Sequence, residues 1–295
     1  MAEYHADQAA GLRRLFGQEG LRVITFAAGS EGVGKTIAVA NVAAAMARQG
    51  KEVLVLDENT AGNVAAVFGA AAKHDLYHVI KRDKRLAEVL VNVAPGVRVL
   101  PAARAVKKLG KLARGEQEAL IESLGAMEHP ADVILVDAST DHPLGFSPLG
   151  LATQETVVVA AASGAAITEA YALIKKVSLG YERRHFRILV NKVKSAADGE
   201  AIHANLAQLA RTRGVALLDY VGHVPLDDAL RHAARLCQPV VAAYPESAAA
   251  SALRAIANDM LHWPPAEAEA GGLEQFVQQL LHLSQRIDPV TIHAG

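Results

Sequence analysis

The segment Gly29-Ser30-Glu31-Gly32-Val33-Gly34-Lys35-Thr36 fits the pattern G-x4-G-K-[ST] without a gap. It follows the apolar run 22–28 and precedes a stretch of helical spacing, which is the context in which this pattern forms a phosphate-binding loop. Glycines allow backbone N–H groups to wrap phosphate oxygens, and the start of a helix adds positive potential. We therefore expect Lys35 to reach the β- and γ-phosphates of a nucleotide and Thr36 to ligate Mg²⁺.

Two aspartates end apolar runs that should lie near this loop. Asp137 follows the run 133–136 and is the candidate second carboxylate beside the magnesium. Asp57 ends another run, where a group that orients water or the outer shell of the magnesium would lie. An ordinary turn-forming aspartate is the alternative for each. Asn191-Lys192 ends a later apolar run, and its amide could read the edge of adenine.

Apolar runs alternate with stretches of helical spacing along residues 21–263. Most runs are continuous, as in strands of a parallel sheet that is covered on both faces. The predicted strands are Arg22–Ala28, Glu52–Asp57, Val97–Pro101, Asp132–Asp137, Thr156–Ala161, Arg187–Asn191 and Val215–Val221. The predicted helices include Thr36–Gln49, Ala103–Leu124, Thr168–Leu179 and Glu200–Thr212. This order predicts an α/β fold, a doubly wound and mostly parallel sheet of the P-loop NTPase type with helices on both faces.

Composition narrows the class of protein. Hydrophobic residues make up 51% of the 295 and aromatic residues 4%, which supports a core of small aliphatic side chains and excludes a disordered chain. The net charge of −1 gives no reason to expect nucleic-acid binding. A single cysteine, Cys237, excludes a disulfide framework and is expected to be a small buried side chain. With no apolar run of roughly 18 residues and no basic leader, a cytoplasmic location is expected.

Three stretches resemble the MinD/ParA class of P-loop ATPases and, within it, the FlhG family of flagellar regulators, also called FleN or YlxH. Asp7-Gln8-Ala9-Ala10-Gly11-Leu12-Arg13 is similar to the D-Q-A-x-x-L-R element that precedes the ATPase domain in that family. Residues 167–175 are like the segment after its fifth strand, and residues 224–240 are like the loop and helix beside the nucleotide base. The first stretch is the most specific, because MinD and ParA proteins do not generally carry it.

The resemblance implies a cytoplasmic switch that controls flagellar number and placement. In the family, the N-terminal helix, here residues 1–20, stimulates the GTPase FlhF; flagellar switch-complex or transcription-factor components are further expected partners. By position, Gln8 would enter the GTP site of FlhF, where an amide can orient the attacking water. The expected contact residues are Asp7, Gln8, Leu12, Arg13, Leu15 and Phe16, the last two forming an apolar stripe with Leu12. The alternative is a helix packed on its own domain with Gln8 in solvent.

The resemblance also implies ATP or ADP with Mg²⁺ as the bound cofactor. The expected nucleotide-binding residues are Gly32, Val33, Gly34, Lys35, Thr36, Ile37, Asn191, Lys192, Pro225 and Asp227. Thr36 and Asp137 are the expected Mg²⁺ residues.

The sequence departs from the family pattern around one reaction centre. The family's loop reads K-G-G-x-G-K-[ST], and its first lysine crosses to the phosphates of the partner subunit; here that position is Ser30, followed by Glu31. The second aspartate of the family's D-x-D is Asn59, an amide that cannot act as a base. The switch D-T-x-A-G becomes residues 137–141 without its glycine. A charge clamp accounts for about 10³–10⁵ in the rate of phosphoryl transfer, so hydrolysis is expected to be slow or absent.

Whether the chain is an enzyme therefore stays open at this point. The candidate catalytic residues are Asp57, Asn59 and Asp137, with Gln8 supplied to the partner GTPase. The alternative function is an active MinD/ParA-type ATPase that positions cargo by cycling. If ATP hydrolysis is slow or absent, ATP-driven dimerisation is expected to be weakened too. A monomer and an ATP-dependent homodimer are therefore both alternatives.

Four regions are expected: residues 1–20, the nucleotide-binding domain 21–263, a Pro- and Ala-rich linker 264–272, and a C-terminal helix and tail 273–295. Residues 273–287 have the apolar spacing of an amphipathic helix, which anchors the family to the inner face of the cell membrane. Its charged residues here are only Glu274 and Arg286, so weak membrane contact is expected. Packing on the domain or on a dimer partner is the alternative.

Overall fold

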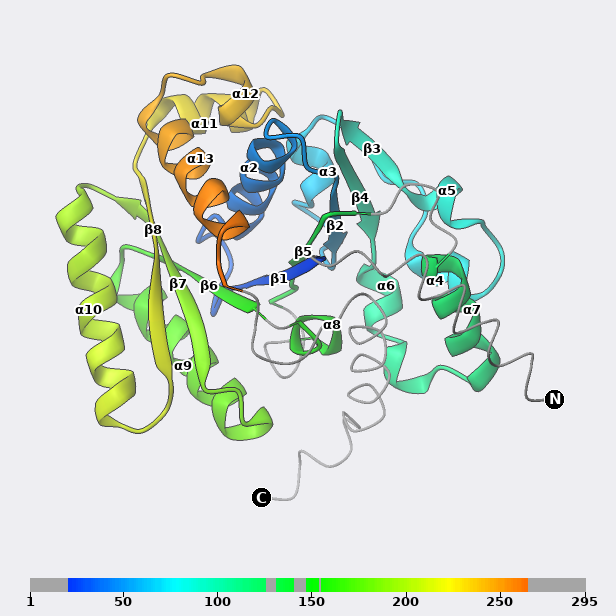
Figure 1. The fold of residues 1–295 in the computed structure, drawn as a ribbon, viewed down its shortest axis with the longest axis horizontal. Coiled ribbons are helices and arrows are strands. Elements are labelled where there is room, and N and C mark those ends of the chain that lie inside the picture. Colours follow the sequence, from blue (N-terminus) through cyan, green and yellow to red (C-terminus); the bar gives the residue numbers. More distant parts are fainter. Residues whose placement is uncertain (1–20, 126–130, 141–146, 154, 265–295) are drawn as a thin grey trace.

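The computed structural model describes residues 21–125, 131–140, 147–153 and 155–264. These residues form one eight-stranded sheet in the order β3-β4-β2-β5-β1-β6-β7-β8 (Figure 1). Neighbouring strands run parallel except for β3 and β4. The strands are β1 (Arg22–Ala27), β2 (Val53–Asp57), β3 (Val91–Ala94), β4 (Val97–Pro101), β5 (Val133–Asp137), β6 (Glu155–Ala161), β7 (His185–Val193) and β8 (Leu217–Pro225). The predicted doubly wound α/β fold is confirmed.

Helices cover both faces of this sheet (Figure 1). The longer ones are α2 (Lys35–Ala47), α7 (Arg114–Gly125), α9 (Gly164–Tyr181), α10 (Ala196–Thr212), α11 (Asp228–Arg235) and α13 (Ala248–Leu261). The shorter ones are α3 (Val64–Val67), α4 (Leu76–Ile80), α5 (Leu86–Val89), α6 (Ala103–Val106), α8 (Pro148–Leu151), α12 (Val240–Ala243) and the 3-10 helix η1 (Leu109–Lys111). None of these helices combines the length and the apolar composition needed to cross a bilayer.

Side chains of each strand alternate between two apolar layers. In β2, Val53 and Val55 pack in the layer with α2 and α13, whereas Leu54 and Leu56 pack in the opposite layer with α4 and α7. Because strands bury both faces, their apolar runs are continuous, which explains the sequence pattern. The parallel pairing of β2 with β5 makes Asp57 and Asp137 register partners at the carboxyl edge of the sheet.

Several boundaries differ from the prediction. The single helix expected over 103–124 is divided into α6, η1 and α7, because Leu112 adopts an extended backbone between the last two. The edge strand β3 was missed, since a four-residue strand that is only partly buried has little apolar pattern. Helices α9 and α10 begin about one turn earlier than expected, where Ser163 and Ser195 cap them.

Cys237 is exposed, which corrects the expectation that it is buried. It follows the end of α11 with a left-handed backbone (φ 52°), and its N–H donates to the carbonyl of Ala234. The turn after the helix therefore carries this side chain out of the core.

Candidate functional site

The phosphate-loop segment joins β1 to α2 near the centre of the sheet. Gly34 immediately precedes the helix with a φ of 90°, a conformation that glycine adopts without steric cost. The helix begins at Lys35, so its first backbone N–H groups have no partner within the helix. At the other end of the loop, a Cβ on Gly29 would lie 2.2 Å from the carbonyl oxygen of Glu169. Glycine thus allows α9 to approach the loop closely.

Asn191, near the end of β7, holds this loop from the side. Its Nδ2 donates to the carbonyl of Val33 at 2.8 Å, and its Oδ1 accepts the N–H of Lys192 at 2.8 Å. A Cβ on Gly34 would lie 2.3 Å from Asn191 Nδ2, so the contact depends on that glycine. The Lys192 ammonium donates to the carbonyl of Gly32 at 2.6 Å. Asn191, whose amide was expected to read the edge of adenine, and Lys192 are therefore both engaged with the loop itself.

Lys35 and Thr36 both meet the carboxylate of Asp137. The Lys35 ammonium is paired with Oδ1, and the Thr36 hydroxyl donates to Oδ2 at 2.7 Å. Asp137 is fully buried, and an unpaired buried carboxylate would be costly. The end of β5 is thereby tied to the start of α2, and the two residues that should meet phosphate and metal are held in place.

Asn59 lies between Asp57 and Asp137. Its Nδ2 donates to Asp57 Oδ1 at 3.0 Å and to Asp137 Oδ2 at 2.8 Å. Burial, and secondly the charge of Asp137, raise the pKa of Asp57 to about 6. Asn59 thus serves as a shared hydrogen-bond donor between two carboxylates. An aspartate here would instead add a third negative charge.

The loop, the ends of β7 and β8, and α11 enclose a pocket of about 810 Å³, within the size range of small-molecule sites. The ten residues expected to bind nucleotide all line it: Gly32, Val33, Gly34, Lys35, Thr36, Ile37, Asn191, Lys192, Pro225 and Asp227. Asn59, Ser30 and Glu31 line it as well. The sequence analysis placed 224–240 beside the nucleotide base without naming the residues of that range that line the pocket, which also include Leu226, Leu230, Arg231 and Ala234, and it did not name Ala61, Gly62 or Thr140 as nucleotide-binding residues. Most of these come from the region of α11, whose amphipathic spacing could have indicated which face turns to the loop.

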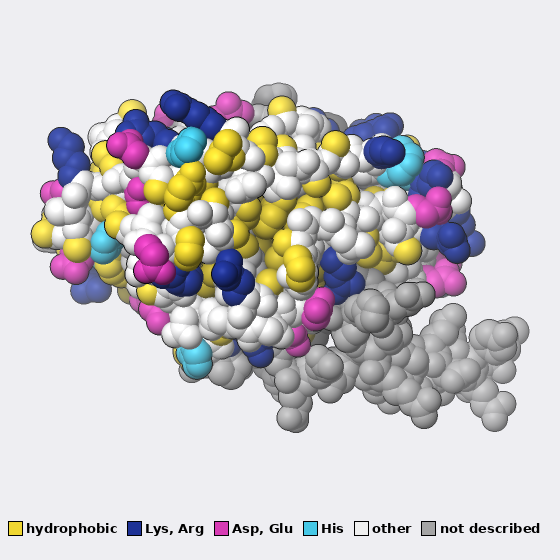
Figure 2. Space-filling model, turned by 90° about the horizontal axis from the view of Figure 1, so that it is seen from above, with side chains coloured by type: hydrophobic (Ala, Val, Ile, Leu, Met, Phe, Trp, Pro, Cys, Tyr) yellow, Lys and Arg dark blue, Asp and Glu magenta, His cyan; other side chains and the backbone are white. Residues whose placement is uncertain are grey.

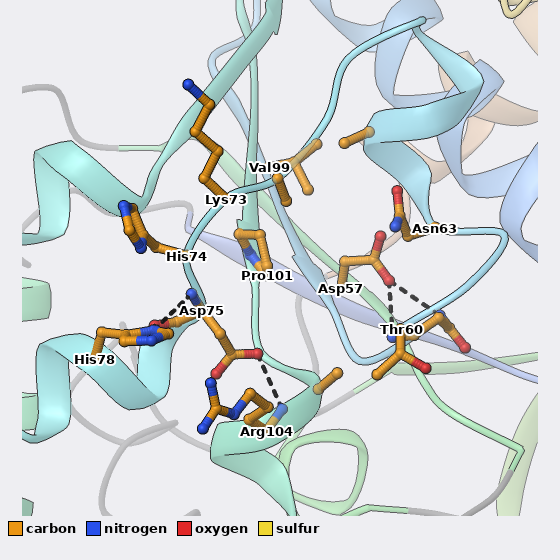
Figure 3. A pocket seen from close by; sticks show the side chains of 14 residues that line it. Asp57, Thr60, Asn63, Lys73, His74, Asp75, His78, Val99, Pro101 and Arg104 are labelled. Atoms are coloured by element: carbon orange, nitrogen blue, oxygen red, sulfur yellow. Dashed lines mark hydrogen bonds between the residues drawn. The ribbon is translucent and has the colours of Figure 1, made fainter.

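Asp57 lines a second pocket of about 190 Å³, next to Asn59 and at the ends of β2 and β4 (Figure 3). Lys73 and His74 extend away from Asp57 in this view. The carboxylate of Asp75 is occupied by backbone N–H groups at the starts of α4 and α6.

Glu58 was not singled out by the sequence analysis, yet its carboxylate is buried beside the site. Its Oε2 accepts the N–H of Ser139 at 2.9 Å, and its Oε1 accepts the hydroxyl of Ser147. Burial, opposed by these hydrogen bonds and by the charge of Lys35, raises the pKa of Glu58 to about 7. Glu58 occupies the middle position of the D-x-D pattern and directly follows a fully buried strand. An acidic residue at that place was the feature of the sequence that could have indicated its role.

The residues present fit a nucleotide with Mg²⁺. Lys35 supplies a buried positive charge at the start of α2, and the Thr36 hydroxyl with the Asp137 carboxylate forms a pair of hard oxygen donors. The N-terminal residues Asp7, Gln8, Leu12, Arg13, Leu15 and Phe16 lie outside the described residues, as do residues 265–272 of the linker and the C-terminal helix and tail 273–295.

Together, the parallel sheet, the loop at the end of β1 and the Lys35–Asp137 pair define a P-loop nucleotide-binding protein. Residues 24–240 match the CobQ/CobB/MinD/ParA nucleotide binding domain. The antiactivator FleN of Pseudomonas aeruginosa is 32% identical over 88% of this chain and 94% of its own length. The flagellum site-determining protein YlxH of Helicobacter pylori is 25% identical over 72% of this chain and 73% of its own length.

Solved structures give the same fold. The cell division protein MinD of Aquifex aeolicus superimposes with a TM-score of 0.64 at 20% identity, covering 83% of this chain and 98% of that one. MinD of Pyrococcus horikoshii, solved with Mg-ADP, has a TM-score of 0.60 at 20% identity, covering 81% of this chain and 95% of that one. The chain belongs to the CobQ/CobB/MinD/ParA family of nucleotide-binding proteins and, within it, is FlhG-like.

Proposed function

We propose that this protein regulates flagellar number and placement as a nucleotide-responsive binding protein. The similarity to FleN and YlxH, which extends over most of the chain, supports this. ATP or ADP would occupy the 810 Å³ pocket, with Lys35 against the phosphates and Thr36 and Asp137 toward Mg²⁺. The bound metal would neutralise phosphate charge, while the loop amides and Lys35 orient the phosphates.

Hydrolysis would be slow or absent, and the position of Asn59 carries this part of the proposal. Its amide nitrogen donates to both Asp57 and Asp137, and its carbonyl oxygen can accept a hydrogen bond from water but is too weak a base to take the proton. Ser30 supplies no cation, and Glu31 adds a negative charge to the pocket lining. Release of phosphate from ATP by purified protein tests this directly. Turnover at rates usual for MinD-type enzymes would favour the second candidate, a cycling ATPase that positions cargo.

The partner in this proposal is the GTPase FlhF, stimulated through residues 7–16. An amide at Gln8 could orient the attacking water in the GTP site of that partner. GTP turnover by FlhF would be measured with the full chain, with Gln8→Ala and with a chain lacking residues 1–20. The full chain should accelerate turnover and both altered chains should not. Equal rates in all three reactions would reject this partner.

Self-association and membrane contact are further parts of the proposal. On the upper side of the molecule, near α11 and α12, apolar side chains gather across the middle and charged side chains lie mostly at the margins (Figure 2). Such a surface favours contact with protein over nucleic acid. Light scattering with and without ATP separates a monomer from an ATP-dependent dimer. Sedimentation with anionic liposomes, comparing the full chain with one ending at Pro265, tests whether residues 273–287 hold the protein weakly at the membrane.

A further inference from the structure

Five basic side chains around α4 and α6 form no ion pair with the described residues: Lys73, Arg104, Lys107, Lys108 and Lys111. We call these five exposed residues the basic surface. Neighbouring cations differ, since Lys81 pairs with Glu116 and Arg114 pairs with Glu118. The charges of the basic surface therefore remain available to an anionic ligand.

Burial of the apolar residues between them turns four of these side chains outward. Helix α6 and the 3-10 helix η1 follow each other closely after β4. The apolar residues of this stretch lie in the layer with α4 and α7: Ala105, Val106, Leu109 and Leu112. The basic residues at 104, 107, 108 and 111 recur at helical spacing and are exposed. Packing of the segment against the core therefore presents its cations on one side.

The pocket of about 190 Å³ at the ends of β2 and β4 shares two residues with the basic surface, Lys73 and Arg104. Figure 3 shows both of them on the side of the pocket away from Asp57. The Arg104 guanidinium lies 5.4 Å from the centre of the Tyr77 ring, a contact that favours this position of the cation. The pocket thus has a basic rim on one side.

The rest of the lining is apolar or already hydrogen-bonded. The apolar lining residues are Ala65, Ala72, Val99, Pro101 and Ala103. The carboxylate of Asp57 accepts the N–H groups of Asn59 and Val64, and that of Asp75 accepts N–H groups at the starts of α4 and α6. These hydrogen bonds offset the negative charge of both carboxylates. The charged groups left to bind a ligand at the rim are therefore cations.

We propose that the basic surface binds an acidic protein segment and that the pocket receives one glutamate side chain of that segment, between Lys73 and Arg104. A water occupies about 30 Å³ in the liquid, so the pocket has room for the few non-hydrogen atoms of such a side chain. Its methylenes would contact the apolar lining, and its carboxylate would pair with the two cations. The proposal goes beyond the regulatory function proposed above and requires no nucleotide.

A nucleic acid fits this surface less well than an acidic segment does. The phosphodiester backbone has no apolar branch that would enter the pocket. A long polyanion would also cross α7, where Glu116 and Glu118 already occupy the neighbouring cations. A short acidic segment can stay within the basic surface.

Fluorescence anisotropy of a labelled decapeptide of alternating glutamate and alanine tests the proposal in the absence of nucleotide. The full chain should bind this peptide at least about tenfold more tightly than the same peptide with glutamine in place of glutamate, and salt should weaken the binding. Arg104→Gln combined with Lys108→Gln should weaken it about tenfold. Arg85→Gln combined with Arg114→Gln, which removes two exposed cations that are already paired, is the matched control and should leave it unchanged.

A second pair of variants tests the pocket separately from the charge. Ala72 lines the pocket and Ala71 does not, and both are exposed. Ala72→Leu should weaken binding of the glutamate peptide about tenfold by filling the pocket, whereas Ala71→Leu should not. Equal affinities of these two variants, or equal affinities of the full chain for the two peptides, would overturn the proposal. Tighter binding of a single-stranded DNA decamer than of the glutamate peptide would also overturn it, in favour of a nucleic acid.

Discussion

Asn59 Nδ2 lies 2.8 Å from Asp137 Oδ2 and donates a hydrogen bond to it, while the same amide nitrogen also donates to Asp57. Two buried carboxylates, register partners on adjacent strands, therefore share one neutral donor. Without metal, this donor reduces the repulsion between them. The amide at this position therefore stabilises the two carboxylates by donating to both of them.

Replacing Asn59 by aspartate should destabilise the metal-free protein. The change removes a donor to two carboxylates and adds a third negative charge, at a cost of about 1–3 kcal/mol for the lost hydrogen bonds alone. We expect Asn59→Asp to lower the melting temperature in EDTA more than Asn59→Ala does. Adding Mg²⁺ and nucleotide should raise the melting temperature of Asn59→Asp by more than it raises that of Asn59→Ala. Equal melting temperatures for Asn59→Asp and the unaltered chain in EDTA would contradict this reading of the site.

The Lys35–Asp137 pair should matter to stability as well as to binding. Both side chains are almost completely buried, so removing Lys35 leaves an uncompensated charge, which typically costs about 3–5 kcal/mol. Lys35→Ala should therefore unfold at lower denaturant concentration, and Lys35→Ala combined with Asp137→Asn should regain part of the loss. Both variants should fail to bind nucleotide, whereas Lys51→Ala, an exposed lysine beyond α2, should leave stability and binding unchanged. A double variant no more stable than Lys35→Ala would argue against the pairing.

Two glycines of the loop form a matched pair for testing the contact with Asn191. Gly32 and Gly34 both have positive φ, so an alanine at either position carries a similar backbone strain of about 1–2 kcal/mol. A Cβ at Gly32 meets nothing within 4 Å, whereas one at Gly34 would lie 2.3 Å from Asn191 Nδ2. We expect Gly34→Ala to weaken nucleotide affinity at least about tenfold more than Gly32→Ala does. Titration calorimetry measures the difference in nucleotide affinity. Equal losses of affinity in the two variants would mean that backbone strain, and not the contact with Asn191, causes the loss.

Much of the fold follows from local sequence, because buried parallel strands leave continuous apolar runs and the phosphate loop fixes the order of the first strand and helix. The strands β1, β2, β4, β5 and β6 were predicted within one residue of their ends. The edge strand β3 was not, since it is short and only partly buried. The break between η1 and α7 was also missed, because an extended Leu112 has no signature in composition.

The candidate site also has a part that the sequence predicts and a part that it does not. Residues of the loop are consecutive, so their grouping is visible in the sequence, whereas Arg231 and Leu230 reach the pocket only because β8 places α11 beside the loop. The engagement of Asn191 with Val33, 158 residues away, likewise depends on the register of β7 against β6. Glu58 was missed because its partners are 81 and 89 residues distant and are serines, which carry no strong signal.

The metal-free protein should become less stable as pH rises from about 4.5 toward 7. The pKa of Glu58 is about 7 in the folded chain against an ordinary value of 4.5, so the folded state holds this proton more tightly than the unfolded state does. Unfolding then releases a proton between these values, and the free energy of unfolding falls as pH rises from about 4.5 to 7, by at most ~3 kcal/mol. The charge of Lys35 and the hydrogen bonds from Ser147 and Ser139 oppose the shift, and the charge of Asp137 adds to it.

Glu58→Gln removes this titration while keeping the shape of the side chain. Its free energy of unfolding, measured with urea at pH 5, 6, 7 and 8 in EDTA, should vary less with pH than that of the unaltered chain. A residual slope of the same sign should remain, because burial and the charge of Asp137 also raise the pKa of Asp57 to about 6. Glu122→Gln, altered at an exposed carboxylate on α7, should keep the full slope. Identical slopes for Glu58→Gln and the unaltered chain would show that Glu58 is ionised throughout this range, despite its burial.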